Sequence, residues 1–212
     1  MPTDRVAERD RPTDDGPALI IVRHGETEWS ASGQHTGRTD VDLTETGRRQ
    51  ARCAGQLVQQ LLQGREPGPV ISSPRSRARD TALLAGFAPT EVTEDAGEWD
   101  YGELEGRTTE QIRQDLPGWT VWAGPVPGGE TADQVSARAD AVLARCDPKQ
   151  PLLVFSHGHF SRCLAARWLG QPVTHGRFLQ LGTGAVCSLG FEHDYPVVLR
   201  WNIDEEISRA GC

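Results

Sequence analysis

Two short apolar segments of this chain end in the same way, with a histidine followed by a glycine. Residues 18–23 (ALIIVR) lead into His24, and residues 152–156 (LLVFS) lead into His157. The apolar part of each segment is predicted to be a strand buried on both faces, as in a parallel sheet. Ligands bind beyond the carboxyl ends of such strands, so we expect the two imidazoles to face each other in one crevice. One histidine alone would indicate only a strand cap, but two in matching contexts favour a functional site.

Arginines accompany these histidines. Arg23 ends the first of the two segments, and Arg77 follows a third predicted strand at residues 69–73. A guanidinium presents a planar fork that matches phosphate oxygens two at a time. In a chain of net charge −8, two arginines delivered from strand ends would form an anion clamp. Arg75 and Arg79, by contrast, are predicted to lie on a solvated helix face.

Alternating strands and helices must position these side chains. Strands are predicted at residues 18–22, 69–73, 152–155, 186–191 and 197–201, and helices at 44–64, 76–85, 131–145 and 160–169. Such alternation with short connections predicts an α/β fold, a three-layer α/β/α sandwich around a mostly parallel sheet. Residues 87–131 are rich in Gly and Pro, and we expect them to form loops and short helical turns in a small cap over the carboxyl edge of the sheet.

Length and composition exclude several other classes of protein. The 212 residues fit a disordered polar tail at 1–17 and a single domain at 18–212. An excess of acidic residues argues against binding to nucleic acid or to an anionic membrane. The longest apolar run, at 18–22, is too short to span a bilayer. The tail lacks the apolar core of a signal peptide, and the five scattered cysteines indicate reduced thiols, so we expect a cytoplasmic protein.

Several longer motifs complete the pattern. Residues 23–29 (RHGETEW) resemble the signature of the histidine phosphatase superfamily, the phosphoglycerate-mutase-like proteins. Further blocks similar to that family are 33–37 (GQHTG), 43–47 (LTETG), 73–81 (SPRSRARDT), 98–106 (EWDYGELEG) and 156–158 (SHG). Within 73–81 the matching arginine is Arg77, while Arg75 stands where a leucine is usual. The resemblance covers nearly the whole chain after residue 18, and its details are similar to the branch of acid phosphatases and sedoheptulose-bisphosphatase-like enzymes.

This resemblance implies a phosphohistidine mechanism. His24 would attack phosphorus, for which its imidazole must be unprotonated. The positive charges of Arg23 and Arg77 would lower the pKa of that imidazole and neutralise the phosphoryl oxygens in the transition state. His157, if protonated, would add a donor to those oxygens. Glu98 would protonate the leaving alcohol and then activate the water that hydrolyses the intermediate.

The resemblance also suggests contacts to the substrate. The expected contact residues are Ser30, Thr36, Gly37, Tyr101, Gly158 and His159. His159 forms a His-x-His pair with His157, but zinc needs three or four ligands and no third is evident nearby, so neither a metal nor an organic cofactor is expected. We expect His35 behind the phosphate contacts. Trp119 and Trp122, within the cap segment, are either local core or a lid over the substrate.

The middle of the chain distinguishes the mutases of the family from its phosphatases. Mutases carry a longer, basic insertion there, whereas the corresponding segment of this chain, residues 116–130, is short and contains no Lys or Arg. Mutases also usually have Asn where this chain has Ser30. We therefore predict a phosphatase of small phosphorylated metabolites, with sugar phosphates favoured. A phosphoglycerate mutase is the first alternative. A non-catalytic phospho-ligand module is the second alternative, and it is disfavoured because all five expected catalytic residues are present. A homodimer is common in such families and is possible here, although the sequence shows no interface for it.

Overall fold

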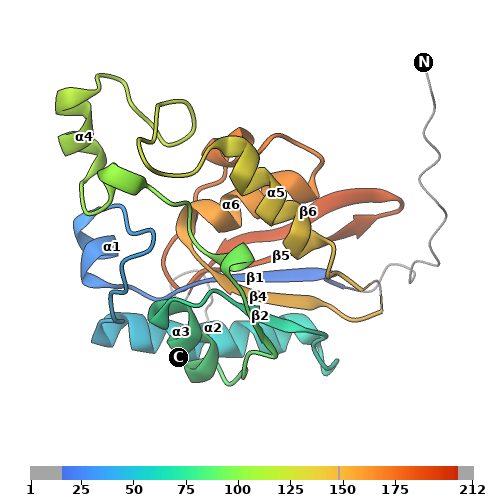
Figure 1. Cartoon of the computed structure of the whole chain (residues 1–212). Helices are drawn as coiled ribbons and strands as arrows, with labels where there is room; N and C mark the ends of the chain where they lie inside the picture. The colour runs from blue at the N-terminus through green and yellow to red at the C-terminus, as the bar shows by residue number, and fades with distance from the viewer. Residues whose placement is uncertain (1–15, 148, 205–212) are drawn as a thin grey trace, which may run out of the picture.

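The computed structural model describes residues 16–147 and 149–204, and a six-stranded sheet runs through this part of the chain (Figure 1). The strands are β1 (Leu19–Arg23), β2 (Val70–Ser72), β3 (Glu91–Val92), β4 (Leu152–Ser156), β5 (Val186–Glu192) and β6 (Tyr195–Ile203), in the order β3-β2-β4-β1-β5-β6. The first four are parallel, and β5 and β6 add an antiparallel hairpin beside β1. The carboxyl ends of β1, β2 and β4 therefore meet at one edge.

Helices cover both faces of the sheet. They are α1 (Glu28–Ser32), α2 (Glu45–Leu62), α3 (Ser76–Leu84), α4 (Thr109–Asp115), α5 (Ala132–Leu143) and α6 (Gly158–Trp168). Helices α2 and α3 lie on one face and α5 and α6 on the other, while α1 and α4 lie beyond the carboxyl ends of the strands (Figure 1). The predicted α/β fold with a mostly parallel sheet is confirmed. None of the helices in the described part of the chain is long and apolar enough to cross a membrane.

The central strands are buried on both faces, which explains their continuous apolar sequences. In β1, Leu19 and Ile21 join the core cluster under α5 and α6, and Ile20 and Val22 join the cluster over α2. All four side chains have no exposed surface. Burying a side chain of this kind stabilises the fold by about 1.5–3 kcal/mol. The site at the end of β1 thus follows directly from a strand that is buried on both faces.

The start of α2 packs directly on the segment that follows β1. Thr44 begins this helix by accepting a hydrogen bond from the main-chain N–H of Gly47. A Cβ atom on Gly25 would lie 2.2 Å from the carbonyl oxygen of Gly47, so the backbones approach as only glycine allows. This contact fixes the main chain next to His24.

Two short elements were not expected from the sequence. Helix α1 is a single turn capped reciprocally by Thr27 and Ser30, and its sequence is too short to show helical periodicity. Strand β3 lies within residues 87–131, predicted to be loops and helical turns, and adds an edge strand to β2; its two residues carry no detectable alternation. Of the predicted tail, residues 1–15 lie outside the described residues, and Pro17 is buried.

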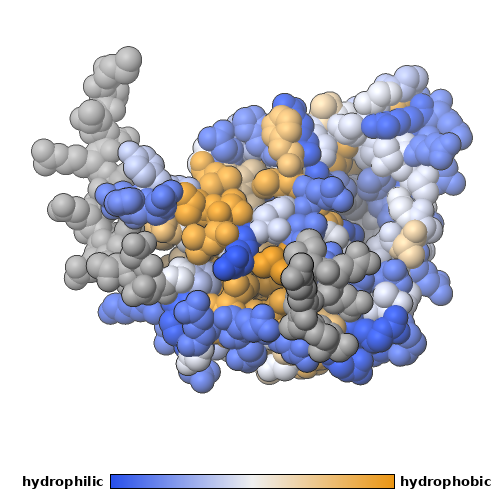
Figure 2. Space-filling view, turned by 180° about the vertical axis from the view of Figure 1, so that it is seen from behind, coloured by the Kyte–Doolittle hydropathy of each residue, from blue (hydrophilic) through white to orange (hydrophobic). Residues whose placement is uncertain are grey.

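The face turned away from the viewer in Figure 1 is mostly hydrophilic, with apolar side chains gathered near its middle (Figure 2). Few large apolar side chains of the described residues are exposed, and they include Leu199 and Tyr195 on the edge strand β6. Residues 148 and 205–212 are not described.

Candidate active site

The pairing of β1 with β4 places the two histidines side by side. Arg23 lies opposite Ser156 in the parallel register of these strands. His24 and His157, which directly follow these two residues, are therefore neighbours. Their ring centroids are 5.2 Å apart, with an edge-to-face arrangement. The two imidazoles therefore lie where the sequence analysis expected them, facing each other at the carboxyl edge of the sheet.

The imidazole of His24 is held in one tautomer. Its Nδ1 lies 2.7 Å from the carbonyl oxygen of Gly25, and because that oxygen can only accept, Nδ1 carries the hydrogen. Burial, together with the charges of Arg77 and Arg23, holds the pKa of His24 well below its usual value. A neutral ring with its hydrogen on Nδ1 leaves the Nε2 lone pair unprotonated. Nε2 of His24 is thus prepared to act as a nucleophile at neutral and mildly acidic pH.

Arg77 is completely buried next to His157. Its Nε donates to Nδ1 of His157 at 3.2 Å, and its Nη atoms donate to carbonyl oxygens of residues 36–39 at 2.8 to 3.0 Å. With Nδ1 accepting, His157 carries its hydrogen on Nε2, which donates to the hydroxyl of Ser73 at 2.7 Å. Burial and the Arg77 charge lower the pKa of His157. The structure therefore favours a neutral His157 over the cationic donor that the sequence left open.

Arg23 faces the pocket from the end of β1. One terminal nitrogen donates to the carbonyl oxygen of Leu181 at 2.6 Å, while its Nε is buried and has no hydrogen-bond partner among the described residues. Gly158 lies against this guanidinium, since a Cβ there would lie 3.3 Å from it. An unpartnered buried N–H is costly and needs an acceptor. Arg23 is accordingly a strong candidate to bind a phosphoryl oxygen.

Glu98 caps the helix that follows His157. Helix α6 has no side-chain cap of its own, and the Glu98 carboxylate accepts from the main-chain N–H groups of His159 and Phe160 at 3.0 and 2.8 Å. It also accepts from Trp99 N–H at 2.9 Å. A carboxylate at a helix N-terminus matches the positive end of the helix dipole. These bonds hold the expected acid at the same sheet edge as His24.

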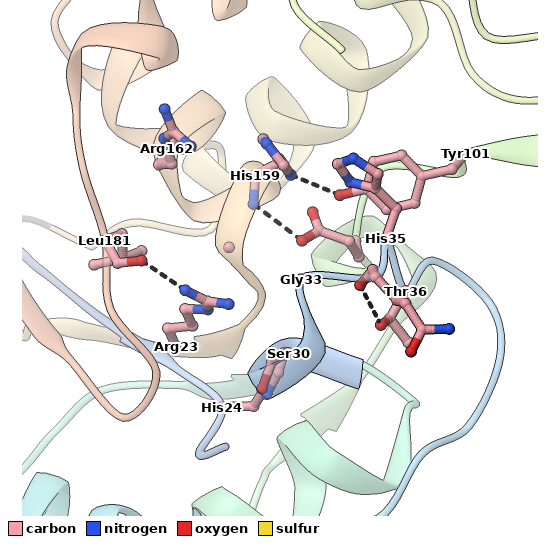
Figure 3. A pocket seen from close by; sticks show the side chains of 13 residues that line it. Arg23, His24, Ser30, Gly33, His35, Thr36, Tyr101, His159, Arg162 and Leu181 are labelled. Atoms are coloured by element: carbon pink, nitrogen blue, oxygen red, sulfur yellow. Dashed lines mark hydrogen bonds between the residues drawn. The ribbon is translucent and has the colours of Figure 1, made fainter. Parts of the chain in front are cut away.

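These side chains surround a cavity of about 160 Å³ (Figure 3). Its lining includes five of the predicted contact residues, Ser30, Thr36, Tyr101, Gly158 and His159, together with Arg23, His24 and Glu98. Gly37 is not in the lining; its N–H donates to Glu105 and its carbonyl oxygen accepts from Arg77. Arg77 and His157 are not in the lining either; His157 lies beside His24, and Arg77 donates to His157. The cavity can hold a phosphate group and a small leaving group.

Arg162 is a charged residue of this cavity that the sequence analysis did not single out. Its Nε donates to the carbonyl oxygen of Gly176 at 2.9 Å, and its guanidinium lies 4.6 Å from the centre of the Trp122 ring. No carboxylate of the described residues forms an ion pair with it. The spacing from His159 to Arg162, three residues on a helix, was the available signal, since such residues share a face.

The two tryptophans of the cap segment are mainly core. Trp119 is buried, donates to the carbonyl oxygen of Pro125 at 2.8 Å, and packs edge-on against His35. Trp122 packs edge-on against His159 with ring centroids 5.1 Å apart. Neither ring lines the cavity, so they support its wall from behind.

His157 and His159 point to different partners, Ser73 and Tyr101, rather than to one shared point. Within residues 16–147 and 149–204, no group of three side chains is arranged to hold a metal ion. The zinc interpretation of the His-x-His pair therefore has no geometric support in this part of the chain.

Comparison with known proteins agrees with this site. The model of the histidine phosphatase superfamily (branch 1) matches residues 19–204. The chain belongs to this superfamily. It is similar to an acid phosphatase of Mycobacterium tuberculosis, with 47% identity over 178 residues that make up 82% of this chain and 87% of the relative. It is also similar to the sedoheptulose 1,7-bisphosphatase of Saccharomyces cerevisiae, with 35% identity over 189 residues, 74% of this chain and 69% of the relative.

A solved structure has the same fold. The protein of an open reading frame of Mycobacterium tuberculosis superposes with a TM-score of 0.82 and 44% identity, covering 88% of this chain and 97% of that protein. The resemblance inferred from the motifs is thereby confirmed. This histidine phosphatase is a hydrolase of phosphomonoesters.

Proposed function

We propose that this phosphatase hydrolyses phosphate esters of small metabolites, sugar phosphates among them, through a phosphohistidine on Nε2 of His24. The observation that carries the proposal is the fixed tautomer of His24, whose Nε2 is unprotonated beside the unpartnered N–H of Arg23. The sedoheptulose 1,7-bisphosphatase relative supports a sugar phosphate as substrate. The small cavity supports a leaving group of metabolite size.

The first half of the reaction transfers the phosphoryl group. The Nε2 lone pair of His24 forms the N–P bond while the ester P–O bond breaks, and Glu98, which must be protonated for this step, gives its proton to the leaving oxygen. Arg23 binds the phosphoryl oxygens directly. Arg77 acts from behind, through its charge and by orienting His157. Positive charge fixed in place before the reaction stabilises the charge that develops on those oxygens.

The second half returns the enzyme to its starting state. Glu98, now a carboxylate, accepts a proton from water, the oxygen of that water attacks phosphorus, and the N–P bond breaks to release inorganic phosphate. His24 recovers its unprotonated Nε2, and Nδ1 keeps its hydrogen bond to Gly25 throughout. The two displacements replace a single difficult attack by water.

A phosphate-release screen over phosphorylated metabolites, carried out across pH, tests this function. We expect steady release of phosphate from sugar phosphates, and release from 3-phosphoglycerate without formation of 2-phosphoglycerate. Formation of 2-phosphoglycerate without phosphate release would identify a mutase and contradict the proposal. His24→Ala, purified in parallel, shows whether any activity belongs to a contaminant.

We also propose the cytoplasm as the site of action, supported by Cys146, Cys163 and Cys187, whose thiols form no disulfide in the described part of the chain. Fractionation of cells that express the chain tests this. The homodimer stays a prediction, which sedimentation analysis of the purified protein would check.

A further inference from the structure

The tyrosine and histidine on the wall of the cavity form a short hydrogen bond. The hydroxyl oxygen of Tyr101 lies 2.6 Å from Nδ1 of His159 (Figure 3). Both residues line the cavity, but Tyr101 is almost fully buried and only 1% exposed. The main-chain N–H of His159 is also bonded to Glu98, so the residue that carries this imidazole is tied to the acid that serves the leaving group.

Tyr101 is the donor in this bond. Its hydroxyl has no other hydrogen-bond partner among the described residues, and a buried hydroxyl hydrogen without an acceptor would be costly. Burial, reinforced by the charge of Glu98, raises the pKa of Tyr101, so the phenol keeps its hydrogen. With Nδ1 accepting, a neutral His159 must carry its own hydrogen on Nε2.

His159 is neutral because of its surroundings. Burial lowers its pKa well below the usual value, with further lowering by the charge of Arg162 and by His35 and Arg23. The groups that face the imidazole of His159 are Arg162 on the same helix, His35, Arg23 and residues 98–101. Nε2 has no hydrogen-bond partner in the described part of the chain, and the ring edge opposite Tyr101 points toward the side of Arg162 (Figure 3). The neutral Nε2–H of His159 thus lies on the side of the Arg162 guanidinium.

We propose that Tyr101 is a positioning residue that fixes His159 as an Nε2–H donor, and that this donor selects esters whose leaving group carries an oxygen acceptor near the ester oxygen. The inference rests on the proposed function. The acceptor is a hydroxyl or an anionic oxygen, and the neighbouring guanidinium of Arg162 suits either. A site built to donate a hydrogen bond discriminates against analogues that lack the acceptor.

A matched pair of esters tests the selection. Glycerol 1-phosphate and n-propyl phosphate have the same carbon chain and differ in their hydroxyls, and 3-phosphoglycerate keeps the C2 hydroxyl but carries a carboxylate in place of the terminal hydroxymethyl group. We expect the wild type to prefer the oxygenated esters in kcat/KM, and Tyr101→Phe and His159→Phe each to reduce that preference by about three- to tenfold, the size of one hydrogen bond. The double variant should show no further loss. A fall with glycerol 1-phosphate assigns a hydroxyl acceptor, and a fall confined to 3-phosphoglycerate assigns an anionic one.

The tautomer itself is measured by long-range ¹H–¹⁵N correlation on protein labelled at histidine. We expect the hydrogen of His159 on Nε2 in the wild type, and its partial or complete movement to Nδ1 in Tyr101→Phe. A hydrogen on Nδ1 in the wild type, or an unchanged ester preference in variants whose thermal unfolding shows them to be folded, overturns the inference. Absence of phosphate release from every ester would instead overturn the proposed function, so the two failures are distinguishable.

Discussion

Replacing Glu98 by glutamine tests the double role of this carboxylate. Its two oxygens accept three main-chain N–H bonds, from Trp99, His159 and Phe160. Glutamine offers one acceptor oxygen, which can keep the two bonds now made by Oε1, and an NH2 group that would face the N–H of His159. The loss of one charge-assisted bond costs about 1.5–3 kcal/mol, and the loss of charge at the helix N-terminus about 0.3–1 kcal/mol.

The expected decrease in the free energy of unfolding is therefore about 2–4 kcal/mol. For a domain of this size it corresponds to a Tm lower by roughly 5–15 °C. Activity should fall much further with poor leaving groups, because loss of a general acid costs about 10²- to 10⁴-fold. An aryl ester such as p-nitrophenyl phosphate needs no proton on its leaving oxygen, so its kcat/KM, which reports only the steps up to the phosphoenzyme, should fall by roughly tenfold or less.

The assay compares kcat/KM for an alkyl and an aryl phosphate at a temperature where the variant is folded, because kcat also contains the hydrolysis step that both esters share. Equal slowing of both esters would refute the role of Glu98 as the acid. Glu130→Gln is the matched control, because Glu130 makes a paired contact with Arg138 at 2.7 Å and accepts from Asp100 N–H, yet does not line the cavity. We expect it to lower Tm without changing the ratio of the two rates.

Three further predictions follow from the site and its support. His24→Ala should abolish turnover while an ester still binds, as measured by calorimetry; turnover near the wild-type rate would contradict the assignment. Burial and the two arginines lower the pKa of His24. Because the unprotonated form attacks phosphorus, acidification should reduce kcat/KM only well below pH 6.5. A kcat/KM profile that falls at about pH 6.5 would contradict this. Gly47→Ala should lower the unfolding free energy by about 1–3 kcal/mol, because the new Cβ would lie 2.1 Å from the carbonyl oxygen of Glu26; an unchanged denaturation midpoint would show that the backbone can relax.

The elements of the fold were largely predictable from the sequence, and the reason is burial. Strands β1 and β4 are apolar throughout because helices cover both their faces, and Thr44 and the apolar spacing that follows mark α2 clearly. The short elements α1 and β3 escaped because one helical turn or two strand residues leave no periodic pattern.

The members of the site were predictable from motifs, but their contacts were not. The register that joins β1 to β4 fixes the distance between His24 and His157, and register depends on tertiary pairing rather than on local sequence. The engagement of Arg77 with backbone carbonyls and the cap that Glu98 places on α6 join segments far apart in the chain. Arg162 was missed because its function depends on where the fold carries α6.

Trapping the intermediate tests the central claim most directly. Enzyme mixed with excess substrate and quenched in alkali, where an N–P bond survives, would be digested and examined by mass spectrometry and ³¹P NMR. We predict a phosphoryl group on Nε2 of His24, because Nδ1 donates to Gly25. A phosphoryl group on Nδ1 or on His157, or phosphate release with no phosphoenzyme at any time in a single turnover, would contradict the account.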